Sequence, residues 1–345
     1  MKPKLAVFIS LMVLFGQTKT VSFLSKNQTF LNFYKTSYVK WSSLLGRLWQ
    51  SVPFSVGDLF YFLSIVFFLY LFYRFRLGWK SFLWLSLYVN LLFFVFYLFW
   101  GFNYFLPKLE TYYKPQEIVL TDLHKTAESL LKECKELREA MPEDSLSLQE
   151  IDAHINQGLV FLPNNLPYKH RVFSASKASF FSTQLSYLGV LGYYNPFTFE
   201  CQYNKKMPGV KWAHTLAHEF AHKLGYAPED QANFIGYLLL EKSSDPRLVY
   251  SAKYKALKSV ITLIYKENDP TYECYLGGFS LKMKSDYTKE LAFEKKYANK
   301  VGDFQSVAYD AFLKGNNQNK GLESYNAFVY LLIAHQRAEK KGDLN

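Results

Sequence analysis

The stretch His218-Glu219-Phe220-Ala221-His222 predicts more about this chain than any other. Its spacing is typical of a metal-binding helix, because residues four apart lie on one helix face and both histidines can reach the same ion. Glu219 follows the first histidine, where its carboxylate can reach a water on that ion and act as a general base. The alternative is a helix that merely carries two histidines on a solvated face.

A third metal ligand is expected just after this box. Gly225 is placed to end the helix, as glycine often does, and Pro228 suits the first turn of a new helix. Glu229 follows at once, so a chain that turns back can bring its carboxylate to the metal, with Asp230 as the second choice. The alternative is that both acids merely favour a helix N-terminus.

These residues form the usual donor set of a catalytic zinc ion, which has three protein ligands and one position left for water. We expect His218, His222 and Glu229 to hold Zn²⁺. His214 lies four residues before His218 and therefore on the same helix face, so it is a candidate supporting group or, in a structural zinc site, a fourth ligand.

An alternating segment precedes the metal helix. Apolar and polar residues alternate over residues 197–204, which predicts a half-buried strand. A free strand edge can bind an extended peptide as an additional strand, so we expect Phe199 and Glu200 to lie at a substrate edge. The alternative is an ordinary sheet strand with one polar face.

The rest of the chain after residue 105 predicts mainly helices, and hence an α+β, mostly helical domain. Pro142 ends a long helix over 122–141, and a capping box at Ser147-Leu148-Gln149-Glu150 starts a shorter one. Beyond the box, helices are expected at about 228–242, 247–267, 287–300, 303–314 and 322–340.

The chain up to residue 105 is strongly apolar and aromatic. Three segments, about 5–20, 59–76 and 82–101, are apolar enough to predict transmembrane helices. The first begins like a signal peptide but lacks a small-residue cleavage site, so we expect a retained anchor. For the other two, the alternative is a buried helical hairpin in a soluble core.

Basic residues beside these segments predict their orientation. Two lysines precede the first span, and three basic residues fill the loop between the other two: Lys2, Lys4, Arg74, Arg76 and Lys80. With these residues in the cytoplasm, residues 21–57 and the part after 105 lie outside it. The mixed aromatic and basic character of 21–57 predicts an amphipathic helix on the outer membrane surface.

The net charge of +11 has two interpretations. The lysines are scattered and no known nucleic-acid module is present, so nucleic acid is not expected as a partner. Attraction to an anionic lipid bilayer is the simpler explanation. The three cysteines Cys134, Cys201 and Cys274 allow one disulfide, whose pairing the sequence leaves open.

The segment Glu229-Asp230-Gln231-Ala232-Asn233 resembles the Glu-x-x-Ala-Asp/Asn helix of gluzincin-type zinc peptidases. The resemblance implies that Glu229 is the third ligand and that Asn233 supports a ligating histidine.

Nearly the whole chain resembles a bacterial family catalogued as domain of unknown function 3810. The segments that carry the resemblance are residues 53–58, 100–104, 196–200, the box through 234, 309–314 and 321–325. The family implies a membrane anchor, here 1–105, followed by a zincin-like domain, here 106–345, but no substrate. Where the family pattern usually has a second glutamate, this chain has Gln231. With Glu229 as the ligand, this difference affects only the rim of the site.

Together these observations predict a membrane-anchored zinc metalloendopeptidase with a peptide or protein substrate. In a two-membrane bacterium it would be a multi-pass inner-membrane protein whose C-terminal domain is periplasmic. The alternative is a non-catalytic envelope protein of zincin fold, with a structural metal or none.

Overall fold

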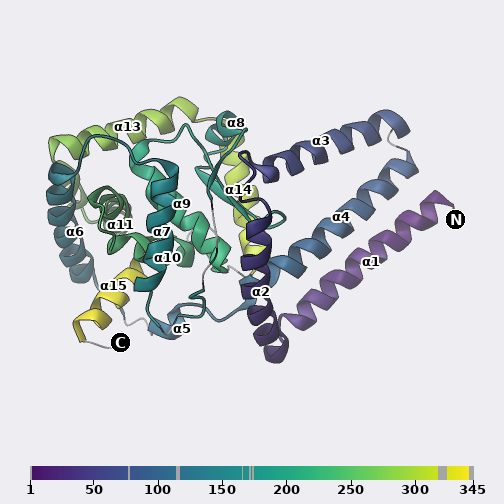
Figure 1. Ribbon diagram of the computed structural model, residues 1–345, viewed down its shortest axis with the longest axis horizontal. Coiled ribbons are helices and arrows are strands. Elements are labelled where there is room, and N and C mark those ends of the chain that lie inside the picture. The colour runs from purple at the N-terminus through teal and green to yellow at the C-terminus, as the bar shows by residue number, and fades with distance from the viewer. Residues whose placement is uncertain are drawn as a thin grey trace.

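Three long apolar helices project from a mostly helical body in the computed structural model (Figure 1). The structure describes residues 2–76, 78–113, 117–164, 166–170, 172, 175–317 and 325–341. The projecting helices are α1 (Pro3–Leu24), α3 (Val56–Phe75) and α4 (Trp79–Phe99), and each is long and apolar enough to cross a membrane. Few of their side chains are buried, so the alternative of a hairpin buried in a soluble core is wrong.

Polar side chains join the projecting helices to one another. Asn90 on α4 donates through Nδ2 to the backbone oxygen of Ser10 on α1 at 3.1 Å, and Ser64 on α3 lies 2.6 Å from the Tyr88 hydroxyl on α4. Such bonds associate helices in lipid, where few other polar partners exist. The N-terminus lies at the same end as the α3–α4 loop, and Lys4 lies over the Trp79 ring (Figure 1).

Helix α2 (Gln28–Leu48) belongs to the body and not only to a membrane surface. Its residues Leu31, Tyr34 and Tyr38 are buried in the main hydrophobic core. The Tyr38 hydroxyl donates to the backbone oxygen of Lys223 at 2.9 Å. The expectation of a helix that only lies on the bilayer is therefore wrong for this face, because its aromatic residues pack against the body instead of lipid.

The short helix η1 (Gly101–Phe105) is buried in the same core, including Phe102, Asn103 and Tyr104. The hydrophobic core therefore continues across the predicted domain boundary at residue 105, which stays a prediction. Among the described residues, the body includes α2 and η1, and α1, α3 and α4 project from it.

The remaining helices follow the predicted order. The long ones are α6 (Leu120–Ala140), α7 (Leu148–Gly158), α9 (Gly209–Leu224), α10 (Glu229–Glu241), α11 (Pro246–Lys266), α13 (Leu281–Tyr297), α14 (Lys300–Gly315) and α15 (Tyr325–Lys341). The short ones are α5 (Glu110–Tyr113), η2 (Leu159–Phe161), α8 (Ser182–Tyr187) and α12 (Tyr272–Gly277). Helix α13 begins earlier than expected because the Ser280 side chain caps it. Residues 322–324 of the last predicted helix lie outside the described residues.

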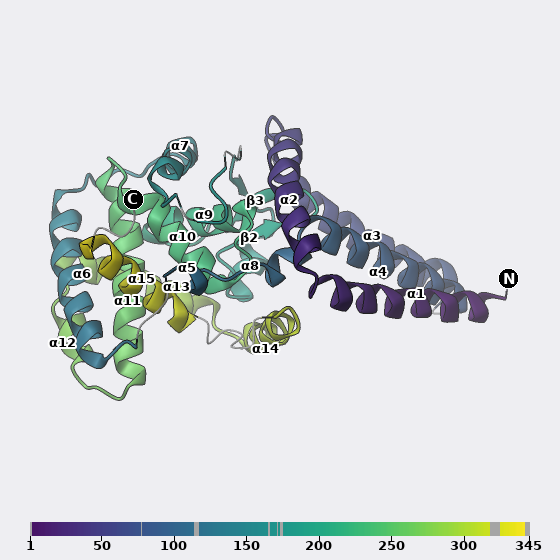
Figure 2. The ribbon, with the colours of Figure 1, turned by 90° about the horizontal axis from the view of Figure 1, so that it is seen from below.

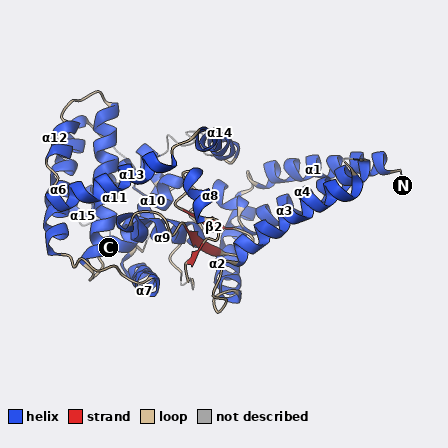
Figure 3. Cartoon of the chain, turned by 90° about the horizontal axis from the view of Figure 1, so that it is seen from above, coloured by secondary structure: helices blue, strands red, loops and turns tan. Residues whose placement is uncertain are grey.

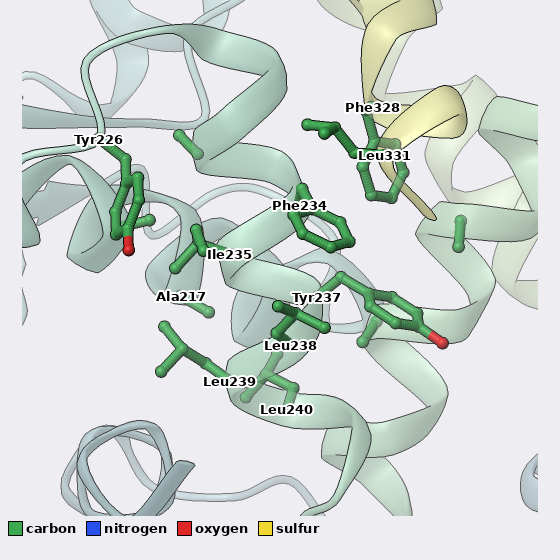
Figure 4. Close-up of a cluster of buried hydrophobic side chains, with 14 of the residues drawn as sticks. Ala217, Tyr226, Phe234, Ile235, Tyr237, Leu238, Leu239, Leu240, Phe328 and Leu331 are labelled. Atoms are coloured by element: carbon green, nitrogen blue, oxygen red, sulfur yellow. The ribbon is translucent and has the colours of Figure 1, made fainter. Parts of the chain in front are cut away.

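Helix α10 is the centre of the body. Every residue from Glu229 to Leu240 is buried, so the helix is covered on all sides. Figure 4 shows its apolar residues between α9 and α15, with Phe234 near Phe328 and Leu331. A helix so enclosed holds its first turn rigidly, and that turn begins with Glu229.

A small sheet lies between α9 and the membrane helices (Figure 3). Its strands are β1 (Lys177–Ala178), β2 (Gly192–Asn195) and β3 (Glu200–Tyr203), in the order β1-β3-β2. Strand β3 pairs parallel with β1 and antiparallel with β2. The edge strand nearest the metal helix is therefore β2, and β3 is central.

The predicted alternating strand over 197–204 is only partly correct. Residues 196–199 form a turn in which Phe199 has a φ of 57°, and the strand begins at Glu200. All four β3 residues are buried, because both faces of the sheet are covered. The alternation of polar and apolar residues predicted one exposed face. That face is buried instead, because its polar side chains form hydrogen bonds inside the protein.

Candidate metal centre

A tight turn between α9 and α10 brings the predicted ligands together. Gly225 ends α9 with a φ of 115°, a conformation that favours glycine, and the chain returns along α9 as α10. A Cβ atom at Gly236 on α10 would lie 3.0 Å from the backbone nitrogen of His218. This close approach of the two helices sets the distance between the histidines and the first turn of α10.

His218, His222 and Glu229 converge on one point. Their three ligand atoms all lie within 4.8 Å of one another. The Nε2 atom of His218 is 3.2 Å from Glu229 Oε2 and 3.1 Å from His222 Nε2. His222 Nε2 lies 3.6 Å from Glu229 Oε1. Two imidazole nitrogens and a carboxylate suit zinc, so the residues present fit the expected ion.

Hydrogen bonds prepare the ligands for a metal. His222 Nδ1 lies 2.8 Å from the backbone oxygen of Tyr226, so Nδ1 donates to this carbonyl and Nε2 is the nitrogen that faces Glu229 and the candidate metal position. The Nδ1 atom of His218 is buried without a hydrogen-bond partner among the described residues. Burial disfavours the charge of Glu229, but hydrogen bonds with both histidines outweigh it and hold the pKa of this carboxyl well below its ordinary value.

Glu219 lies beside these residues, facing strand β2. Its side chain is 5% exposed, and it forms a hydrogen bond with the backbone of Tyr194. Burial raises the pKa of Glu219, although the nearby histidines oppose this shift. A Cβ atom at Gly192 would lie 3.0 Å from both Cγ and Oε1 of Glu219. The edge strand and the carboxylate are therefore in direct contact.

His214 and Asn233 do not take the roles expected of them. His214 Nε2 lies 3.3 Å from the backbone oxygen of Asn233, and His214 is not part of the group of three ligand atoms. Asn233 Nδ2 donates to the backbone oxygen of Glu229 at 2.8 Å. Its side chain is thus bonded within its own helix and not to a ligating histidine. Both residues stiffen the contact between α9 and α10.

Asp230 and Gln231 lie away from the ligand group although both are buried. Burial and the neighbouring carboxylate of Glu110 raise the pKa of Asp230 to about 7. The structure therefore brings Glu229, and not the second-choice ligand, to the two histidines.

The expected substrate edge at Phe199 and Glu200 is wrong. Phe199 is 2% exposed, and the Glu200 carboxylate accepts hydrogen bonds from the Gly57 backbone nitrogen at 2.6 Å, Thr198 Oγ1 at 2.8 Å and Lys177 Nζ at 2.6 Å. Gly57 is in the first turn of α3, where a negative charge is favoured. Glu200 thus joins a membrane helix to the sheet.

A cleft of 1340 Å³ contains the ligand group. It is lined by Tyr61 and Ile65 of α3, Phe96 of α4, and Thr262 and Lys266 of α11. The edge strand β2 also lines it, and α14 contributes Gln305, Ser306 and Tyr309.

Two residues near the ligands were missed by sequence reasoning. The Tyr309 hydroxyl on α14 donates to Glu229 Oε1 at 2.5 Å. The Trp100 ring lies edge-on to His222, with the ring centres 6.0 Å apart. Both residues belong to segments that carry the family resemblance, and this is the sequence feature that could have marked them as candidate site residues. Trp100 thus packs against helix α9, which carries His222.

The three cysteines lie in described parts of the chain and none forms a disulfide. Cys134 and Cys201 are buried, and Cys274 is exposed.

Among known protein families, the model described as "Protein of unknown function (DUF3810)" matches residues 33–333. No curated protein and no solved structure matches the chain.

Proposed function

The chain belongs to this family, DUF3810, and we propose from its site that it is a membrane-anchored zinc metalloendopeptidase. The observation that carries the proposal is the convergence of His218, His222 and Glu229, with Glu219 beside them in an open cleft. Three protein donors leave room for a water, which distinguishes a catalytic zinc site from a structural one. When bound, zinc lowers the pKa of a coordinated water and polarises the scissile carbonyl.

Each residue has a defined part in peptide hydrolysis. The buried Glu219 accepts a proton from the attacking water and passes it to the leaving amine. The raised pKa of Glu219 suits this double role, because it makes the carboxylate a stronger base toward the attacking water, while the leaving amine is more basic still and can take the proton from it. The Tyr226 carbonyl orients His222, and Tyr309 orients Glu229.

The edge strand β2 suits the binding of an extended peptide. It is paired on one side with β3, and its residues Gly192, Tyr193 and Tyr194 line the cleft next to Glu219. A peptide added to its other side would lie with one carbonyl near the metal site. Because α3, α4 and α11 all contribute residues to the cleft that holds the ligand group, we infer room for an extended chain and cleavage inside it, not at a terminus.

The basic residues of the anchor support a location. Those at the far ends of α1, α3 and α4 favour a cytoplasmic position for those ends, and this supports a body outside the cytoplasm. In a two-membrane bacterium, this arrangement amounts to an inner-membrane protein with a periplasmic active site.

Substitution of Glu219 tests the chemistry. Purified full-length protein would be incubated with a mixture of unstructured peptides, and cleavage followed by mass spectrometry beside zinc analysis. We expect Glu219→Gln to retain zinc and to lose hydrolysis by about a hundredfold to ten-thousandfold. Glu229→Gln should lose zinc, and Asp230→Asn, a neighbouring acid away from the ligands, should change neither. A Glu219→Gln protein that cleaves peptides at the wild-type rate would overturn the mechanism.

The non-catalytic alternative predicts a different result. A structural site would need a fourth protein ligand, and His214, the candidate for that place, faces the Asn233 carbonyl. Wild-type protein that holds zinc but cleaves no peptide under any condition would favour this alternative.

A further inference from the structure

Helix α14 is weakly packed against the rest of the protein. All of its residues, 300–315, are described, and only Leu313 is buried. Val301 is 61% exposed, Phe304 75% and Val307 68%. Apolar side chains so exposed on one helix normally mark a contact surface.

The exposed residues form one stripe along the helix. Val301, Phe304, Ala308 and Ala311 are spaced by three or four residues, and Val307 flanks them, so they share one face. Tyr309 lies on another side of the helix and lines the cleft. The helix therefore has an inner face for the site and an outer apolar face.

Both ends of α14 are bonded to parts of the molecule near the membrane helices. At its C-terminal end, the Tyr97 hydroxyl of α4 donates to Asn316 Oδ1 at 2.9 Å, and Phe312 lies by Phe96 of α4 with ring centres 6.2 Å apart. At its N-terminal end, Asn299 Nδ2 donates to the Tyr187 backbone oxygen at 2.6 Å.

These contacts place α14 at the body-side end of the membrane helices. It runs across the direction of α3 and α4 in Figure 1 and is seen nearly end-on beside the end of α1 in Figure 2. A helix in this orientation lies along the membrane surface and does not cross the membrane. Its contact with Phe96 and Tyr97 makes its surface continuous with that of a helix that enters the bilayer.

We propose that the outer face of α14 lies in the surface of the lipid bilayer, and that this contact holds Tyr309 at the metal site. The apolar stripe enters the acyl boundary while the helix axis stays in the plane of the headgroups. The inner face then presents the Tyr309 hydroxyl to Glu229 Oε1, at 2.5 Å. Tyr309 is a positioning residue, because it acts on the carboxylate of a metal ligand.

This inference assigns a second membrane contact to the chain, separate from the three spans. It rests on the proposed function only in treating Glu229 as a metal ligand. Lipid contact and zinc affinity can both be measured without any hydrolysis, so the inference can be tested separately from the peptidase activity.

Fluorescent labels on α14 test the contact with lipid. In full-length protein carrying Cys274→Ser, which removes the exposed cysteine, either Phe304→Cys or Asp303→Cys would carry an environment-sensitive fluorophore. The protein would be reconstituted in phosphatidylglycerol-containing vesicles with or without brominated acyl chains. We expect a blue-shifted label at 304 that brominated lipid quenches, and a label at 303 that aqueous iodide quenches more strongly. Equal quenching of both labels by iodide would overturn the proposal and leave the stripe as a surface for a protein partner.

Zinc affinity tests the link to Tyr309. Tyr309→Phe removes the hydrogen bond to Glu229, and the loss of such a supporting group should weaken zinc binding about tenfold to a hundredfold. Replacement of Val301, Phe304 and Val307 by serine should weaken it to a similar degree in vesicles. The variant with both changes should bind zinc about as weakly as either variant alone, because both changes remove the contact between Tyr309 and Glu229. If the serine variant binds zinc with wild-type affinity, lipid contact is not what positions Tyr309.

Discussion

Gly192 illustrates how single residues shape the site. It occupies the edge strand at a point where any side chain would meet Glu219, and a Cβ atom there would also lie 3.0 Å from the backbone oxygen of Gln202. The space between Glu219, the proposed general base, and strand β2, the proposed peptide-binding edge, is therefore too small for one added methyl group.

Gly192→Ala should therefore impair hydrolysis without removing zinc. The added methyl group displaces the Glu219 carboxylate, and small displacements of a catalytic group are costly, so we expect a rate about tenfold to a hundredfold lower. Peptide cleavage and zinc content would be measured on the same preparation. Gly209→Ala is the matched control, because a Cβ atom there meets nothing within 4 Å. Unchanged cleavage by Gly192→Ala would show that the carboxylate is not held against β2.

At the residue scale, the box and its spacing were sufficient to predict that His218, His222 and Glu229 lie together. Helical geometry alone places His218 and His222 on one face, and the turn signals at Gly225 and Pro228 predict the return of Glu229. Tyr309 could not be predicted in this way, because it is eighty residues from Glu229 and only the folded chain brings it to the ligand.

At the scale of elements, strand β3 and the start of α3 form a buried polar joint. Glu200 binds the first turn of α3, and Asp58 in that turn accepts a hydrogen bond from the Phe180 backbone nitrogen at 2.6 Å. Gly57 is tightly enclosed, since a Cβ atom there would lie 2.5 Å from side-chain atoms of Asn195 and Gln202. The joint holds a membrane helix at a defined place on the body.

Glu200→Gln should destabilise this joint. The change leaves the buried ammonium group of Lys177 without its charge partner, which typically costs about 3–5 kcal/mol. Thermal unfolding in detergent and amide hydrogen exchange in the first turn of α3 would report the loss. The double variant Lys177→Met with Glu200→Leu removes both charges and should recover much of the stability. Wild-type stability in Glu200→Gln would contradict the importance of this ion pair.

The periodicity of residues 197–204 did not predict that strand β3 is buried or that it is bonded to α3. Alternation normally identifies a half-exposed strand, yet here Glu200 and Gln202 are buried because other elements supply their partners. The helices were predicted more successfully, since their caps and apolar faces are local properties of the sequence. Helix α2 shows what the sequence does not predict, namely the surface that a helix packs against. An aromatic amphipathic helix can pack on protein as well as on lipid.

For the whole molecule, the arrangement places the metal site close to the membrane helices. Residues of α3 and α4 line the same cleft as the ligands. The candidate ligands therefore lie beside helices that are long and apolar enough to cross a membrane.

Labelling of Cys274 tests the orientation of the whole molecule. It is exposed on α12, so a membrane-impermeant maleimide should react with it in cells whose outer membrane alone is permeabilised. In a Cys274→Ser background, Lys2→Cys at the opposite end should react only after the inner membrane is opened. The reverse pattern would place the body in the cytoplasm and contradict the proposed location.

The sequence by itself determined the membrane helices, the order of the body helices and the candidate ligands. These features depend on local composition and on helical spacing, which neighbouring residues specify. Only the tertiary structure decided that β2 and not β3 is the edge, that Glu200 binds a membrane helix, and that α2 and η1 belong to the body. It also placed Tyr309 at the metal site. Such contacts join segments far apart in the chain, and they depend on how buried polar and aromatic groups find partners once the chain is folded.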